Sequence, residues 1–329
     1  MRWALYGVLV VLLAGCQAIS YYSQAIGGHL RVLSSARPVE AWIADPATPP
    51  DLKRRLETAR RIREFATRSL ALPDNGSYLS YAELDRAYVV WNVFAAPAFS
   101  VEPRQECFPF TGCVSYRGFY AEEDARRHAE KLRQAGNDVH IGGVPAYSTL
   151  GWSDDPLLST FIRYPDAQLA RLVFHELAHQ VVYAKNDTTF NESFAVAVEE
   201  EGVRRWLEAE NRSGELEAFR DGQARKREFA ARVSETRERL AEVYRKGLAP
   251  EAMLEHKRAE WEKLRAAYPG MPAEPNNAVL ASIAVYTELV PSFERLLAES
   301  GSLEAFYARV KALAATERSS RDPLLARRP

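Results

Sequence analysis

The sequence His175-Glu176-Leu177-Ala178-His179 is the most informative stretch of this 329-residue chain. Residues four apart lie on the same face of a helix, so both imidazoles can reach one metal ion. Zn²⁺ binds histidine nitrogen at about 2.0–2.1 Å, and the glutamate between the histidines can act as general base on a zinc-bound water. Residues 165–185 are apolar on nearly every side, which predicts a buried helix. The stretch therefore predicts a fold built around a buried, metal-carrying helix; two hydrogen-bonded histidines without a metal are the alternative.

A second segment, Asn191-Glu192-Ser193-Phe194-Ala195, offers a carboxylate as the third ligand. Three protein ligands leave a fourth position open, which is typical of a catalytic zinc, so we expect one Zn²⁺ per chain. Twelve residues separate His179 from Glu192, which requires a tight turn between two helices. Glu192 could instead cap its helix, because Thr189 and Glu192 also fit a capping box. Glu199, seven residues later on the same helix face, is a second carboxylate near the histidines.

The N-terminus is typical of an exported protein. Met1-Arg2 is basic, and residues 3–14 are apolar but too few to span a bilayer. Leu13-Ala14-Gly15-Cys16 resembles the lipobox of bacterial lipoproteins, which implies a signal peptide over residues 1–15 and a lipidated Cys16. An ordinary secretory signal is the alternative. Because Gln17 and not aspartate follows the cysteine, we expect a lipid-anchored protein of the cell envelope, on the outer membrane and facing the periplasm.

Cys107 and Cys113 flank a short loop, and an oxidising compartment permits a disulfide between them; two free thiols are the alternative. The formal net charge is −1 with both signs interspersed, so nucleic acid is not an expected partner. No later stretch reaches 18 apolar residues, which predicts no further membrane span. No organic cofactor is expected.

The hydrophobic pattern predicts an α+β chain that is mostly α. A small α/β layer precedes the metal helix, and everything after that helix is helical. We expect helices at 50–71, 120–135, 189–210 and within 276–314, and strands at 88–96, 112–117, 138–141 and 144–149, the last two joined by a turn at Gly142-Gly143. Residues 213–268 predict a long, charged αα-hairpin broken near Gly247 and Pro250, and the tail at 317–329 is expected to fray.

His-Glu-Leu-Ala-His-Gln and Asn-Glu-Ser-Phe-Ala-Val-Ala-Val-Glu resemble the gluzincin branch of zinc metallopeptidases, and within it a bacterial lipoprotein family of predicted aminopeptidases. The likeness also covers the lipobox with residues 20–25, the run 144–152, Asn276-Asn277-Ala278 with Tyr286, and residues 289–294. It implies one zincin-like domain over residues 16–329 and hydrolysis of peptide substrates. The chain departs from the larger aminopeptidases of this branch, where about 18 residues separate the second histidine from the third ligand.

The resemblance also implies roles for individual residues. Glu192 is then the third ligand, and Glu199 accepts a hydrogen bond from a zinc-bound imidazole. Glu176 is the general base, and Tyr286 donates to the oxyanion, although a core tyrosine is an equal alternative. Residues 144–149 are expected either to bind extended substrate as an edge strand or to form a buried strand. Asp154 and Asp155 could hold a substrate α-ammonium or simply form a turn.

Three functions remain open from the sequence. The first is an aminopeptidase on short peptides, and the second is an endopeptidase on envelope proteins or wall peptides. The third is a catalytically degenerate, zinc-stabilised scaffold of the envelope. The glutamate between the two histidines favours an enzyme, because a scaffold needs no general base there.

Overall fold

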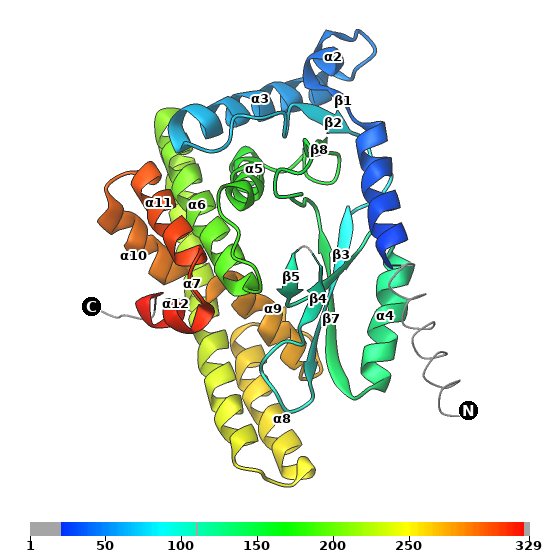
Figure 1. The fold of residues 1–329 in the computed structure, drawn as a ribbon, viewed down its shortest axis with the longest axis vertical. Helices are drawn as coiled ribbons and strands as arrows, with labels where there is room; N and C mark the ends of the chain where they lie inside the picture. Colours follow the sequence, from blue (N-terminus) through cyan, green and yellow to red (C-terminus); the bar gives the residue numbers. More distant parts are fainter. Residues whose placement is uncertain (1–20, 110, 326–329) are drawn as a thin grey trace.

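The computed structural model describes residues 21–109 and 111–325, and Figure 1 shows their arrangement. The predicted signal peptide and Cys16 lie outside the described residues. None of the helices within the described part of the chain is long and apolar enough to cross a membrane.

Strands and helices are mixed in the first half of the chain. After helical residues 21–35 come β1 (Arg37–Pro38), α2 (Val39–Ala44), α3 (Pro50–Leu70), β2 (Ser80–Ala82), β3 (Val90–Pro97), β4 (Glu106–Phe108), β5 (Gly112–Val114), β6 (Arg117–Phe119), α4 (Glu122–Gln134), β7 (Asn137–Val144) and β8 (Leu157–Leu158). The second half is helical: α5 (Asp166–Val181), α6 (Thr188–Ala209), α7 (Ser213–Arg245), α8 (Pro250–Ala267), α9 (Asn277–Thr287), α10 (Val290–Ser300), α11 (Leu303–Ala314) and α12 (Arg318–Leu325). The protein is therefore α+β and mostly α, as the pattern predicts.

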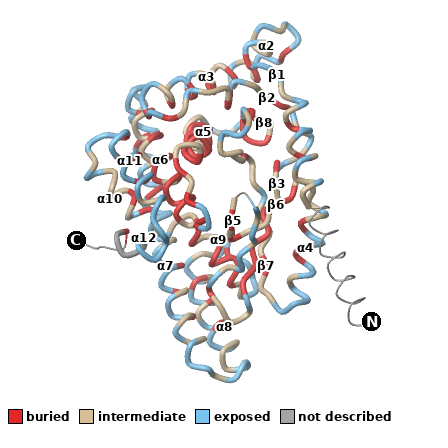
Figure 2. The backbone as a smooth tube through the Cα atoms, in the orientation of Figure 1, coloured by how far each residue is buried: buried red, intermediate tan, exposed pale blue. Residues whose placement is uncertain are grey.

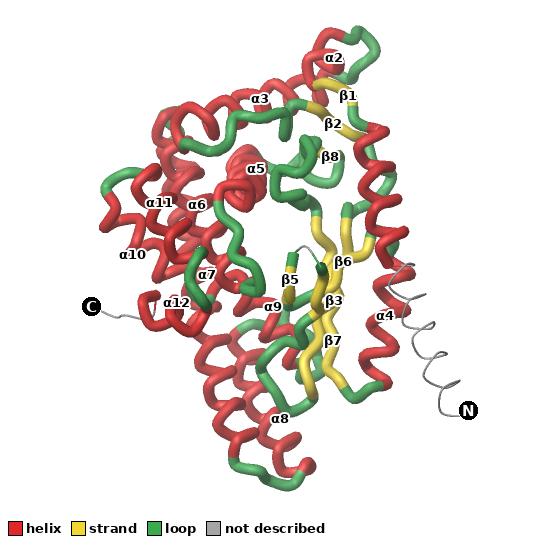
Figure 3. The backbone as a smooth tube through the Cα atoms, viewed as in Figure 1, coloured by secondary structure: helices red, strands yellow, loops and turns green. Residues whose placement is uncertain are grey.

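The largest strand pairing joins β3 to β7, in a three-stranded antiparallel sheet of order β6-β3-β7. Successive side chains of β3 point to opposite faces. Val93 and Ala95 pack in a cluster with Ala125 and Ala129 of α4, whereas Phe94 and Ala96 pack against Ala278 of α9. Figure 3 shows that this sheet lies between α4 on one side and α5 on the other.

Helix α5 lies in the main core, and Figure 2 shows its backbone as buried. It packs along α6, which follows after a short turn. Gly202 of α6 permits this close approach, because a Cβ there would lie 2.7 Å from the Phe174 ring and 2.9 Å from the Leu70 side chain. Burial of α5 on all sides follows from its apolar sequence and holds the two histidines in a rigid frame.

The charged hairpin is formed by α7 and α8, with the break where the sequence predicts it. Gly247 adopts a left-handed φ of 63° in the turn, and Pro250 occupies the first turn of α8. The hairpin has a small core of its own, with Val233, Leu240, Trp261 and Leu264 packed against Leu280 of α9. This core attaches the hairpin to the body of the protein.

Gly142 and Gly143 do not form a turn, so the predicted hairpin of two strands is wrong. They lie inside β7, which runs without interruption beside β3. A Cβ at Gly143 would lie 2.3 Å from the Tyr88 ring, so this glycine makes room for an aromatic side chain. Residues 145–149 form no strand.

Three other segments differ from expectation. The helix with the two histidines ends at Val181 and not at residue 185, and the strand expected at 112–117 is divided between β5 and β6. Within the tail that was expected to fray, residues 318–325 form α12. In that tail Arg321 is buried and makes an ion pair with Asp187 in the turn before α6. A distant partner therefore orders a segment that has little apolar character of its own.

Candidate metal centre and active site

Helices α5 and α6 bring His175, His179 and Glu192 together. The two Nε2 atoms are 3.2 Å apart, and Oε2 of Glu192 lies 3.3 Å from Nε2 of His175 and 3.5 Å from Nε2 of His179. An ion with tetrahedral bonds of about 2.0–2.1 Å holds its ligand atoms about 3.3–3.4 Å apart. The three side chains are buried and can therefore hold one metal ion, and their nitrogen and oxygen donors suit zinc.

The electrostatics of this group favour a positive charge at its centre. Burial alone would lower the pKa of His175, but its hydrogen bonds to Glu192 and Glu199 and the charges of Glu199 and Glu176 raise that pKa to about 10. Burial would raise the pKa of Glu192, yet the charges of the two histidines and their hydrogen bonds hold it well below its usual range. A metal cation bound between these side chains would stabilise the ionised Glu192 and Glu199 in the same way as a proton on His175 does.

Glu199 lies behind the group and contacts His175. Its Oε2 is 2.9 Å from Nδ1 of the imidazole, which leaves Nε2 to face the cluster. Arg171 donates to both oxygens of Glu199, at 3.1 and 3.2 Å. Glu199 thus has the geometry expected of an acceptor that orients a metal-binding histidine. Arg171 was not predicted, although its place four residues before His175 on the same helix was a usable signal.

Tyr116 contacts the second carboxylate oxygen of Glu192, and the sequence did not predict this contact. Its hydroxyl donates to Oε1 of Glu192 at 3.3 Å. The capping-box interpretation of Glu192 is wrong, because Asp187 caps α6 by accepting from the backbone N–H of Phe190 at 3.0 Å. Since Tyr116 comes from the distant strand region, no local pattern could reveal this contact.

Glu176 lies beside the cluster and is buried. Its burial raises the pKa of the carboxyl, and the charges of His175 and His179 only partly oppose this. A carboxylate with a raised pKa is a better proton acceptor at neutral pH.

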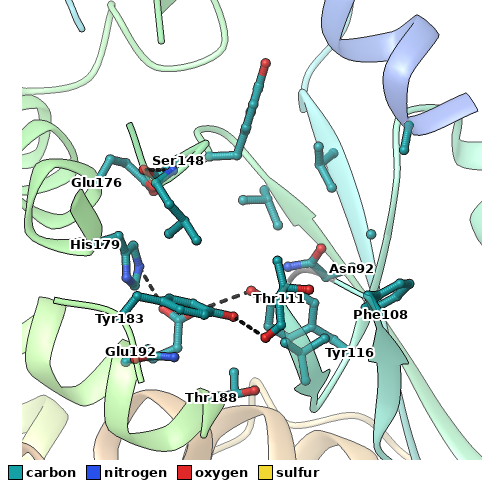
Figure 4. A pocket seen from close by; sticks show the side chains of 18 of the residues that line it. Asn92, Phe108, Thr111, Tyr116, Ser148, Glu176, His179, Tyr183, Thr188 and Glu192 are labelled. Carbon is teal, nitrogen blue, oxygen red and sulfur yellow. Dashed lines mark hydrogen bonds and ion pairs between the residues drawn. The ribbon is translucent and has the colours of Figure 1, made fainter. Parts of the chain in front are cut away.

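A cavity of about 410 Å³ lies in front of the cluster and reaches from α5 and α6 to the sheet. Figure 4 shows Glu176, His179 and Glu192 on one wall and Asn92, Phe108 and Tyr116 on the opposite wall. Tyr286 of α9 also lines it, and burial together with Glu192, Glu176 and Glu199 raises the pKa of its hydroxyl well above the usual value. Tyr286 therefore stays a neutral donor. Asp154 and Asp155 do not line the cavity, so the structure does not support them as an amine anchor.

The rim of the cavity includes a disulfide-closed hairpin. The structure joins Cys107 of β4 to Cys113 of β5, which are paired in register. The hairpin contributes Phe108, Pro109 and Thr111 to the cavity lining, and the Tyr183 hydroxyl donates to the Thr111 carbonyl at 3.1 Å. Residues 21–35 add Tyr21, which stacks on Phe108, with the Arg117 guanidinium 4.0 Å from the Tyr21 ring centre. Residues 21–35 therefore pack on the body of the protein.

The chain was compared with protein-family models, with curated proteins and with solved structures. Neither a curated protein nor a solved structure matches. One family model, described as "Putative aminopeptidase", matches residues 20–325. This match includes the cluster, Glu176, Tyr286 and the cavity wall, so the chain belongs to the family that this model describes.

Proposed function

We propose that this protein is a zinc-dependent peptidase with a zincin-like fold that hydrolyses peptide bonds. The observation that carries the proposal is the meeting of three metal-ligand atoms, 3.2 to 3.5 Å apart, with Glu176 on the wall of one cavity. The family description supports a peptidase-like activity. A zincin-like arrangement is supported by the two packed helices that supply the ligands and by the small sheet on the other side of the cavity.

The chain's residues divide the work as follows. His175, His179 and Glu192 would hold the ion; Glu199 orients His175, and Tyr116 orients Glu192. A zinc ion held there lowers the pKa of water toward 7 and polarises a carbonyl group. Glu176 accepts the proton from the attacking water and passes it to the leaving amine. The Tyr286 hydroxyl is placed on the cavity wall to donate to the oxyanion.

Aminopeptidase activity is the form that the family description supports. One observation favours the endopeptidase alternative. The described residues that line the cavity include no acid besides Glu176 and Glu192, and both of these have roles at the cluster. The α-ammonium group of an aminopeptidase substrate would therefore find no carboxylate on the cavity wall that is free to bind it.

Removal of zinc tests the proposal. Dialysis against a chelator is expected to reduce peptide hydrolysis by at least about 100-fold, because metal polarisation of the carbonyl contributes several kcal/mol. One equivalent of Zn²⁺ should restore the rate, whereas Mg²⁺ should not, because two imidazoles suit zinc. Hydrolysis of a fluorogenic peptide library and metal analysis of the same samples measure both. Full zinc content with no hydrolysis would instead favour the scaffold.

We also propose that the protein is anchored in the cell envelope by a lipid on Cys16. The supporting observations are the lipobox, the absence of any acidic residue before Glu40, and the solvent face of residues 21–35. On that face Ile26 is 59% exposed and Leu30 is 56% exposed, although both are large apolar side chains. A surface of this kind suits a position close to lipid headgroups.

Cys16→Ser is expected to abolish membrane anchoring, because the thioether lipid has no attachment site. The variant should accumulate as an unprocessed or soluble species. Fractionation with mass analysis of the N-terminus measures this, and Gln17→Asp is a control that keeps the lipid. A mature-sized Cys16→Ser protein that still sediments with membranes would show that another feature holds it there.

A further inference from the structure

Asn92 is a polar side chain in an apolar environment. It lies in the middle of β3, on the face that also carries Phe94 and Ala96, and it is 6% exposed. It lines the cavity, and none of the hydrogen bonds among the described residues uses its side-chain amide. The amide atoms of Asn92 are not among the fully buried unpaired atoms, so they open onto the cavity, where a bound molecule can pair with them.

The two strands beside β3 leave space around Asn92. Its partners across the sheet are Gly118 of β6 and Gly142 of β7. A Cβ at Gly118 would lie 3.2 Å from Oδ1 of Asn92, and one at Gly142 would have no atom nearer than 3.8 Å. Cross-strand neighbours share a face of the sheet, so two glycines leave the amide uncovered. Figure 4 shows Asn92 facing across the cavity toward the wall with Glu176 and His179.

The rest of the cavity lining offers no partner for a charged α-ammonium group of a substrate. No lysine, arginine or aspartate occurs among the described lining residues; of the two glutamates, Glu192 belongs to the cluster and Glu176 lies beside it. The rest of the wall is uncharged, with apolar side chains such as Phe108 and Leu150. It also includes neutral polar side chains such as Ser148 and Asn191. An α-ammonium group of a substrate would lose water here without gaining a carboxylate that is not already engaged at the cluster, which is unfavourable.

We propose that Asn92 binds a backbone amide of the peptide, through its paired donor and acceptor, and that the cavity takes an apolar residue that carries no charged terminus. This inference rests on the proposed peptidase function. A carboxamide matches the N–H and C=O of a peptide group in kind. The substrate class is then an uncharged apolar segment, either inside a chain or with a blocked N-terminus.

The test compares acetyl-Phe-Leu-amide with its free-amine twin, Phe-Leu-amide. The wild type should cleave the acetylated peptide at least about tenfold more efficiently, because the free ammonium is not paired. Asn92→Ala should raise KM for the acetylated peptide about 5- to 100-fold with little change in kcat, since a bound hydrogen bond is lost. Asn92→Asp supplies a carboxylate of the same shape and should shift the preference toward the free amine.

Controls keep this result separate from the peptidase proposal. Gln134→Ala, on the exposed surface of α4, should behave as the wild type. Thermal unfolding and zinc content show whether each Asn92 variant is folded and loaded. Binding of both peptides to the Glu176→Gln variant, by calorimetry, reports recognition without turnover. Peptide binding that depends on Asn92, without hydrolysis by the wild type or any variant, would contradict the peptidase proposal but support the role of Asn92 in binding. A wild type that prefers the free amine, or an Asn92→Ala variant with unchanged KM and binding, would overturn it.

Discussion

Glu176→Gln is expected to reduce peptide hydrolysis by about 10²–10⁴-fold, the range that general-base catalysis contributes. Glutamine keeps the size of the side chain and part of its hydrogen bonding, but it cannot accept the proton. Because Glu176 is not one of the three ligand side chains, the variant should retain its zinc. Its fold should also survive, because removing a buried carboxylate with a raised pKa relieves a desolvation cost.

The measurement is kcat and KM on a cleavable peptide, together with metal content and thermal unfolding of the same preparation. Glu217→Gln is the matched control, since it makes the same chemical change on the exposed surface of α7. A Glu176→Gln enzyme with turnover within tenfold of the wild type would show that another group accepts the proton. Loss of zinc in this variant would place Glu176 among the ligands.

Glu192→Ala is expected to abolish tight zinc binding, whereas Glu199→Ala should weaken it by about 10–100-fold. The first change removes a ligand atom that lies 3.3 and 3.5 Å from the two histidine nitrogens. The second removes only the acceptor that orients His175, at 2.9 Å from Nδ1. Arg171→Ala should have a smaller effect in the same direction, because it acts on zinc through Glu199.

Zinc occupancy by mass spectrometry and competition with a chelating dye give the two affinities. Glu217→Gln again serves as the surface control. Full occupancy in the Glu192 variant with loss in the Glu199 variant would reverse the two assignments. Equal loss of zinc in both variants would mean that Glu199→Ala disrupts the positions of all three ligands. Thermal unfolding of the zinc-free proteins would detect such a disruption.

The sequence by itself determined the features that depend on local spacing. Two histidines four apart lie on one helix face whatever the rest of the chain does, and the apolar run around them required burial. The hairpin break near Gly247 and Pro250 follows from backbone preferences of those two residues. The mostly helical α+β composition follows from the same periodicities, because each depends on only a few neighbouring residues.

Only the tertiary structure decided which distant side chains meet. Tyr116 reaches Glu192 across 76 positions, and Arg321 reaches Asp187 across 134. Gly143 looked like a turn residue but makes room for Tyr88, and Asn92 stands uncovered because glycines of two other strands flank it. Each of these contacts depends on strand register or helix packing between segments far apart in the chain. Local propensity carries no information about such a contact, because its free energy arises only when the two segments are already placed.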